Sequence, residues 1–170
     1  CYETDRIKVT TRNIKKFLVF IEDKDFYSHS GISYKSLARI ILGLMKIKPK
    51  SGGSTIVQQL TRTLFIQDLS KTKRRKLIEL ALAPWITSIF PKETILEIYI
   101  SSVRFERGCF GVVEAMEYFW KEPVKNATNA QAFFLIERVS NIRSRLLVNK
   151  IIETARSARD QGIMDRSDLK

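Results

Sequence analysis

The spacing of apolar residues constrains this chain more than any other feature of its sequence. Apolar side chains recur every three or four positions, as in Ile14, Phe17, Leu18 and Ile21, which share one face of a helix ending near Glu22. No stretch shows the sustained alternation of apolar and polar residues that is typical of a half-buried strand. The sequence therefore predicts a mostly α fold.

Further helices are predicted along the rest of the chain. Pro84 falls inside the segment 70–90 and should kink or interrupt that helix, whereas Pro91 suits the first turn of the next one. No internal repeat, low-complexity segment or Gly/Ser linker is present, so residues 1–170 are predicted to form a single domain. The predicted helical segments after residue 22 are 33–45, one that starts near Thr55, 70–90, 92–101, 111–119, 128–140 and 145–161.

The chain is strongly basic, with 30 Lys and Arg against 18 Asp and Glu and a formal net charge of +12. Such an excess indicates a polyanionic partner (nucleic acid, an anionic membrane or a phosphorylated substrate), although a solvated basic surface would have the same composition. The two cysteines, Cys1 and Cys109, are too few for a disulfide framework, and their pairing stays open. No apolar run reaches the roughly 18–20 residues of a spanning helix, so any membrane anchor is expected outside this sequence.

Three segments carry residues suited to catalysis or binding. The first, 22–31, brings carboxylates, aromatic rings and the only histidine, His29, to the point where a helix gives way to a loop. Acidic residues at a helix C-terminus oppose the helix dipole, so local stability does not explain Glu22 and Asp23. A carboxylate in such a cluster suits a general base, and the structural alternative is a solvated acidic turn held by His29.

The second segment, 51–62, joins a Gly-Gly pair to a Ser-Thr pair at a predicted helix start. Glycines before a Ser/Thr cap leave backbone N–H groups at the helix N-terminus available to an anion or a sugar hydroxyl. Gln58 and Gln59 add amides that both donate and accept, as carbohydrate recognition requires. A flexible loop followed by a well-capped helix is the structural alternative.

The third segment places Arg75 and Lys76 four and three residues before Glu79, which puts all three on one helix face. A carboxylate held beside cations suits a site that grips a pyrophosphate. The structural alternative is an ordinary helical ion pair, which stabilises a helix by only about 0.3–0.5 kcal/mol.

Four motifs follow one another along the chain. Residues 22–31 read Glu-Asp-x-x-Phe-x-x-His-x-Gly, residues 52–60 read Gly-Gly-Ser-Thr-Ile-x-Gln-Gln-Leu, and residues 75–79 read Arg-Lys-x-x-Glu. In this order and spacing they resemble the peptidoglycan glycosyltransferase family, which also forms the polymerising half of bifunctional penicillin-binding proteins. The fourth motif, Lys-x-x-Ile-Leu-Glu-x-Tyr, is met by Lys92, Ile95, Leu96, Glu97 and Tyr99.

The resemblance implies a lysozyme-like larger lobe and a small membrane-facing jaw subdomain at about 31–50. It implies an inverting enzyme that joins lipid II to a growing lipid-linked glycan chain and releases undecaprenyl pyrophosphate. In that reaction Glu22 is the expected general base, and Glu79 is expected to position the donor and help the pyrophosphate leave. The substrate-binding residues implied by the motifs are Asp23, Phe26, His29, Gly53, Ser54, Thr55, Gln58, Gln59, Arg62, Arg75 and Lys76.

Cofactors, partners and location follow from the same resemblance. A divalent cation, Mg²⁺ or Mn²⁺, could assist the leaving group, although no ligand cluster identifies its site, and no organic cofactor is expected. The expected partners are lipid II, the glycan chain, an anionic membrane surface and other cell-wall synthesis proteins, but not nucleic acid. The expected location is the outer, periplasmic face of the bacterial cytoplasmic (inner) membrane, and moenomycin is the expected inhibitor.

The membrane partner is also supported by segment 31–50. Its five Lys and Arg residues, without any acid, alternate with apolar residues, as is typical of an interfacial helix on anionic lipid. An amphipathic helix packed on the core is the structural alternative.

Three other functions were weighed. The chain departs from the family after Tyr99, where Ile100 and Ser101 replace Leu-Asn, and this favours a catalytically impaired relative that binds lipid II or a cell-wall complex. A lytic, glycan-cleaving enzyme would leave the basic cluster around Glu79 unused. A nucleic-acid-binding protein lacks support, because no helix-turn-helix pattern, zinc ligands or aromatic platform is present.

Overall fold

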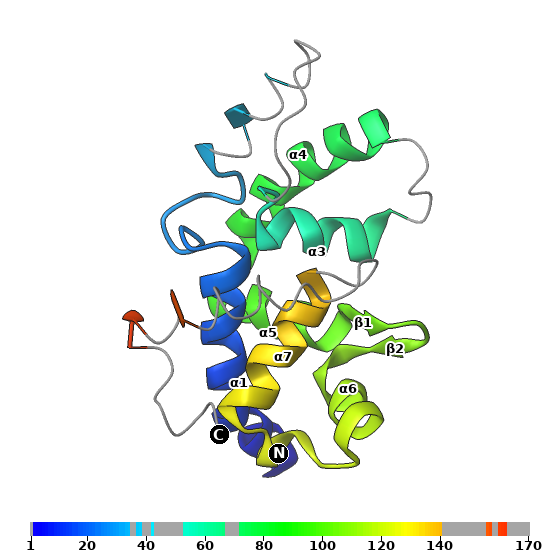
Figure 1. Cartoon of the computed structure of the whole chain (residues 1–170). Coiled ribbons are helices and arrows are strands. Elements are labelled where there is room, and N and C mark those ends of the chain that lie inside the picture. Colours follow the sequence, from blue (N-terminus) through cyan, green and yellow to red (C-terminus); the bar gives the residue numbers. More distant parts are fainter. Residues whose placement is uncertain are drawn as a thin grey trace. The chain divides into compact units, whose positions relative to one another are not determined.

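The structure, a computed structural model, describes residues 2–34, 37–38, 42, 53–66, 72–140, 156–157 and 160–162. This part of the chain is mostly helical, which confirms the predicted fold class (Figure 1). The elements are α1 (Tyr2–Glu22), α3 (Ile56–Phe65), α4 (Thr72–Ile89), α5 (Lys92–Ser102), β1 (Arg104–Glu106), β2 (Cys109–Phe110), α6 (Gly111–Trp120), the 3₁₀ helix η1 (Val124–Asn126) and α7 (Asn129–Ser140).

Contacts within the chain define two compact units. The first unit comprises Cys1–Ile21 and Ile100–Lys170, and the second comprises Glu22–Tyr99. Most of 31–50 and of 145–161 lies outside the described residues, so the single domain, its jaw and the last predicted helix stay predictions. Every predicted site residue falls in the second unit.

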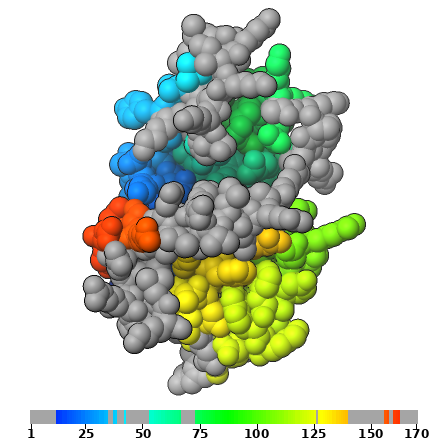
Figure 2. Space-filling model, viewed as in Figure 1, coloured from blue at the N-terminus to red at the C-terminus, as the bar shows by residue number. Residues whose placement is uncertain are grey.

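The first unit is held together by aromatic and aliphatic packing. Ile14, Phe17 and Leu18 of the predicted α1 stripe are buried, and Ile21 is half-buried. Phe17 meets Phe133 of α7 edge to face, with ring centroids 5.8 Å apart. Phe134 packs against Phe119 and Trp120 of α6, and the surfaces of α6 and α7 adjoin in Figure 2. The burial of the α1 residues agrees with the amphipathic helix that their spacing predicted, while Phe119, Trp120 and Phe134 are half-buried.

A two-stranded hairpin in the first unit was not predicted. Strands β1 and β2 pair antiparallel, with Arg104 opposite Phe110 and an irregular register. Strands of three and two residues are too short to show the alternation by which a strand is recognised. Cys109 on β2 is a free, buried thiol.

In the second unit, α3 packs against α4, and the loop after α1 lies against the α4 backbone. Gly31 in that loop has φ +94°, and a Cβ added there would lie 2.4 Å from the carbonyl oxygen of Ala83. Only glycine fits this contact, because the backbone is left-handed and the space is filled. The interruption expected at Pro84 is absent, since the α4 helix runs through that residue.

Candidate active site

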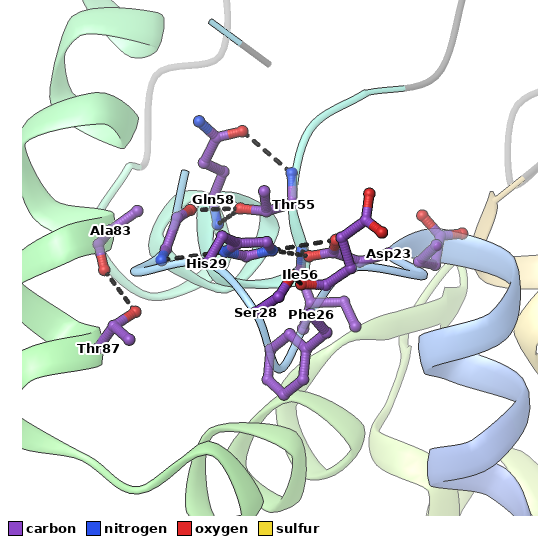
Figure 3. Close-up of polar contacts among 12 residues, drawn as sticks. Asp23, Phe26, Ser28, His29, Thr55, Ile56, Gln58, Ala83 and Thr87 are labelled. Atoms are coloured by element: carbon purple, nitrogen blue, oxygen red, sulfur yellow. Dashed lines mark hydrogen bonds and ion pairs between the residues drawn. The ribbon is translucent and has the colours of Figure 1, made fainter. Parts of the chain in front are cut away.

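Asp23 is the anchor of the loop that follows α1. Its side chain is 6% exposed, and its Oδ2 accepts a hydrogen bond from the backbone N–H of Ile56, 3.1 Å away, at the start of α3. The same carboxylate accepts from Nε2 of His29 at 3.0 and 3.1 Å (Figure 3). A negative charge at a helix N-terminus is favourable, so Asp23 fixes α3 to the loop.

The hydrogen bonds of His29 define its tautomer. The backbone N–H of Gly31 can only donate, so Nδ1 of His29, 3.1 Å away, accepts. The ring proton is therefore on Nε2, where it is donated to Asp23. His29 is thus a neutral link between the loop and the carboxylate, and its side chain is only 7% exposed.

The start of α3 is closed by a capping box. The Thr55 hydroxyl accepts from the N–H of Gln58 at 3.1 Å and donates to the carbonyl of Gly31 at 2.7 Å. The Gln58 side chain accepts in return from the N–H of Thr55 at 3.0 Å. Asp23 accepts from the N–H of Ile56. The N–H groups of Thr55, Ile56 and Gln58 are therefore already used within the chain, and the prediction that this helix start offers free N–H groups to an anion is wrong for these three.

Glu22 lies at the last residue of α1 and is half-buried. Its Oε2 accepts from Nε2 of Gln59 on α3 at 2.7 Å. Oε1 of Gln59 in turn accepts from the hydroxyl of Tyr99 on α5, also at 2.7 Å. The carboxylate expected to be the base is therefore held by a neutral amide and keeps contact with solvent.

Glu79 has the opposite surroundings, because its side chain is 0% exposed and two cations flank it. Nζ of Lys76 lies 2.5 Å from Oε2 and also donates to the Ser54 hydroxyl at 2.8 Å. Nε of Arg75 lies 3.5 Å from Oε1, an ion-pair distance without hydrogen-bond geometry. The predicted clustering on one helix face is confirmed, and the ion pairs named as its structural alternative do form, with the Glu79 carboxylate fully buried.

Lys92, at the first residue of α5, closes the loop from the other side. Its Nζ donates to the carbonyls of Phe26 at 2.7 Å and His29 at 2.6 Å, and it lies 4.6 Å from the centroid of the Phe26 ring. Burial lowers the pKa of Lys92, and the negative charge of Asp23 opposes that shift. The ring of Phe26 is fully buried, so this residue supports the loop from the core.

The predicted substrate-binding residues thus fall into two sets. Asp23, Phe26, Thr55 and Gln58 are buried, and the contacts described above shape the loop and the start of α3. The partly exposed residues, whose contact with a substrate stays a prediction, are His29, Gly53, Ser54, Gln59, Arg62, Arg75 and Lys76.

Tyr99 and Lys92 were not among the predicted site residues, although both belong to the fourth motif. They are seven residues apart and so lie on one face of α5, and this spacing could have predicted that their side chains point the same way. The motif does not identify their hydrogen-bond partners, because Gln59, the partner of Tyr99, and the Phe26 carbonyl, a partner of Lys92, lie on other elements.

Comparison with known proteins agrees with this arrangement. The sequence profile of the Transglycosylase family matches residues 3–166. A biosynthetic peptidoglycan transglycosylase of Neisseria meningitidis is 35% identical over 133 residues, which cover 78% of this chain and 80% of that protein. That of Bdellovibrio bacteriovorus is 28% identical over 93% of this chain and 68% of its own length. Penicillin-binding protein 4 of Bacillus subtilis is 32% identical over 72% of this chain.

The chain therefore belongs to the transglycosylase family. Within it, the similarity is to biosynthetic peptidoglycan transglycosylases, as the four motifs implied, and this family has its place in the cell envelope. The chain spans 20% of the Bacillus protein and 54–57% of several Neisseria relatives. Among the described residues, no helix is both long enough and apolar enough to cross a membrane.

Proposed function

We propose that this chain is a peptidoglycan glycosyltransferase that polymerises lipid II into glycan strands. The observation that carries the proposal is the pair of glutamates in opposite surroundings within the second unit. Glu22 is half-buried and held by the neutral Gln59, whereas Glu79 is fully buried between Arg75 and Lys76. A general base needs the first environment, and a site for a leaving pyrophosphate needs cations such as those in the second.

The proposed reaction is a direct displacement with inversion at the anomeric carbon. The acceptor's 4-hydroxyl oxygen forms a bond to C1 of the donor, while the bond from C1 to the pyrophosphate oxygen breaks and its electron pair leaves with undecaprenyl pyrophosphate. Glu22 takes the proton that the hydroxyl loses. General-base catalysis of this kind contributes about 10²–10⁴-fold in rate.

The role of Glu79 in this proposal is to hold cations. Arg75 and Lys76 carry two positive charges against one carboxylate, so the cluster keeps a positive charge that the pyrophosphate can use. The hydrogen bond from Lys76 to Ser54 joins this cluster to the residues just before α3. Arg62, half-buried on the same helix as Gln59, completes the proposed phosphate-binding set.

The described residues do not fit a resident metal site. No group of three or more potential His, Cys, Asp or Glu ligands occurs among them, and the Glu79 carboxylate is already flanked by Lys76 and Arg75. If Mg²⁺ or Mn²⁺ takes part, we propose that the substrate pyrophosphate binds it, as is usual for Mg²⁺ with phosphates. No step of the proposed reaction depends on it.

The substrate determines the proposed location. Because lipid II is held in a bilayer, the proposed site of action is the outer, periplasmic face of the cytoplasmic membrane, with an anionic lipid surface and cell-wall synthesis proteins as partners. The excess of positive charge supports a contact with anionic lipid.

The test is polymerisation by purified protein supplied with lipid II and Mg²⁺ in detergent or liposomes. Wild type should form glycan polymer that moenomycin blocks, and Glu22→Gln should reduce the rate at least about 100-fold while the circular dichroism spectrum is unchanged. Glu117→Gln, on the exposed side of α6, is the matched control and should retain the wild-type rate. Wild-type protein that binds lipid II without forming polymer would replace this proposal by the impaired relative.

A further inference from the structure

A chain of two hydrogen bonds runs from the core of the second unit to Glu22. It starts at the hydroxyl of Tyr99, a fully buried residue, and passes through the side-chain amide of Gln59. It ends at Oε2 of Glu22, and both bonds measure 2.7 Å. Three elements that are far apart in the sequence, α5, α3 and the end of α1, each contribute one group.

This relay has only one orientation when Glu22 is ionised. A carboxylate can only accept, so Gln59 must turn its NH₂ group toward Glu22. Its carbonyl oxygen then faces Tyr99, and the Tyr99 hydroxyl must donate. Each group in the relay thereby fixes the direction of the next, and the last acceptor is the carboxylate of Glu22.

Tyr99 is suited to remain the donor. Burial raises the pKa of Tyr99 well above its usual range, and the negative charge of Glu22 raises it further. Arg62, the other charged group that acts on this hydroxyl, lowers the pKa and does not outweigh the burial. The hydroxyl proton is therefore retained throughout the pH range in which an enzyme of this kind would work.

We infer that Tyr99 is a positioning residue for Glu22, acting through the side-chain amide of Gln59. The inference rests on the proposed function, in which Glu22 is the general base. The Tyr99 hydroxyl is buried and bonds Gln59. By donating to the carbonyl oxygen of Gln59 it holds the amide in the orientation that directs the NH₂ group to Glu22, and so keeps the hydrogen bond to that carboxylate in place.

Loss of the Tyr99 hydroxyl would remove this constraint. The carbonyl oxygen of Gln59 would then lack its buried donor, and the amide would hold its NH₂ group toward Glu22 less firmly. A weaker hydrogen bond to the ionised form of Glu22 favours the protonated form. A protonated Glu22 cannot act as a base, so the turnover step is affected while substrate binding is not.

The experiment compares Tyr99→Phe with Tyr27→Phe in the lipid II polymerisation assay. Tyr27 is the matched control, because its hydroxyl also bonds a side-chain oxygen at 2.7 Å, that of Glu93, but stands outside the relay. Tyr99→Phe should lower kcat about tenfold, leave KM within about twofold, and move the acidic limb of the kcat–pH profile to higher pH. Tyr27→Phe should change none of these. A wild-type kcat and profile in Tyr99→Phe, or an equal loss in both variants, would overturn the inference.

A double-mutant cycle tests whether Tyr99 acts through Gln59. In a Gln59→Met background, which lacks the amide, Tyr99→Phe should have no further effect on kcat. Additive losses would mean that the Tyr99 hydroxyl acts by a route other than Gln59.

A third measurement separates this inference from the proposed function. The side-chain NH₂ resonances of Gln59 in ¹⁵N NMR spectra should shift with the protonation of Glu22 in wild type, and this response should disappear in Tyr99→Phe. If wild type makes no polymer but the NMR response behaves in this way, the proposed function fails and the relay stands. If polymer forms and Gln59 does not respond to Glu22, the relay fails alone.

Discussion

Glu22 and Glu79 are the same residue type in the same unit, yet their carboxylates differ in burial and in the groups that contact them. Glu22 ends a helix, is half-buried and meets the neutral amide of Gln59 at 2.7 Å. Glu79 lies in the middle of α4, is 0% exposed and is flanked by Lys76 and Arg75. The contacts described for Glu22 include an uncharged amide, whereas those described for Glu79 are with two cations.

The comparison bears on the roles proposed for the two carboxylates. Glu22 accepts from the uncharged amide of Gln59 and is half-buried, which suits the proposed base. Glu79 is fully buried beside Lys76 and Arg75, and removing its charge would leave two cations facing a neutral group in a buried place. These surroundings support the proposed division of roles.

The largest expected effect comes from neutralising each glutamate in turn. Glu79→Gln should lower the free energy of unfolding by about 2–3 kcal/mol, because Lys76 and Arg75 lose their counter-charge. The loss stays below the 3–5 kcal/mol range of a fully buried pair, since the Lys76 side chain is 34% exposed and can be solvated. Glu22→Gln should cost less than about 1 kcal/mol, because a glutamine oxygen still accepts from Gln59.

Urea unfolding followed by circular dichroism measures both variants. Equal losses in Glu79→Gln and Glu22→Gln would show that burial and charge partners do not distinguish the two carboxylates. A Glu79→Gln protein as stable as wild type would show that the cation cluster makes no net contribution to folding, as can happen for buried ion pairs.

A second, smaller contrast separates Glu22 from its neighbour Asp23. Two donors, Nε2 of His29 and the N–H of Ile56, share the Asp23 carboxylate. With its oxygen in the place of Oδ2, Asp23→Asn removes the negative charge and turns an NH₂ group toward Nε2 of His29, which is a donor, so we expect a loss of about 2 kcal/mol of unfolding free energy. The matched control is Asp25→Asn at an exposed site in the same loop, which should stay within about 0.5 kcal/mol. Indistinguishable urea midpoints for these two variants would contradict the anchoring role of Asp23.

Many of the helices were predictable because the buried face of a helix appears in the sequence as apolar residues every three or four positions. The stripe Ile14, Phe17 and Leu18 is buried as its spacing predicted, and Thr55 caps α3 as expected of threonine before an apolar run. The hairpin at 104–110 was missed because its strands are too short to carry a pattern. Pro84 was expected to kink or interrupt its helix, and the interruption does not occur, since α4 continues from Thr72 to Ile89. Ala83 and Ile86 on either side of it are buried.

Contacts within one helix of the candidate site were predictable, but contacts between different elements were not. The three residues of the Glu79 cluster are neighbours on one helix, so their contact follows from spacing alone. The relay from Tyr99 to Glu22 joins three elements across 40 and 37 residues of sequence, and no local pattern contains it. The acceptor of the Ile56 N–H at the start of α3 could not be predicted for the same reason, because it is Asp23, 33 residues away.

The smallest expected effect concerns the two tyrosines that bond side-chain oxygens. Partial burial, the hydrogen bond to Glu93 and the charge of that carboxylate raise the pKa of Tyr27 to about 12. Because the raised value belongs to the folded state, its contribution to stability is complete below the unfolded value near 10 and disappears as the pH rises from 10 to about 12. Wild type should therefore lose stability over this interval more steeply than Tyr27→Phe, although the difference is small because the Tyr27 side chain is 59% exposed.

Ultraviolet titration of the phenols distinguishes Tyr27 from Tyr99. The Tyr27 step near pH 12 should be absent in Tyr27→Phe, whereas the buried Tyr99, whose pKa is raised well above the usual range, should ionise only when the protein unfolds. A Tyr99 that titrates reversibly in the folded protein near pH 10 would mean that its hydroxyl reaches solvent. In that case it could not stay fixed as the donor to Gln59, and Glu22 would be held by the Gln59 amide alone.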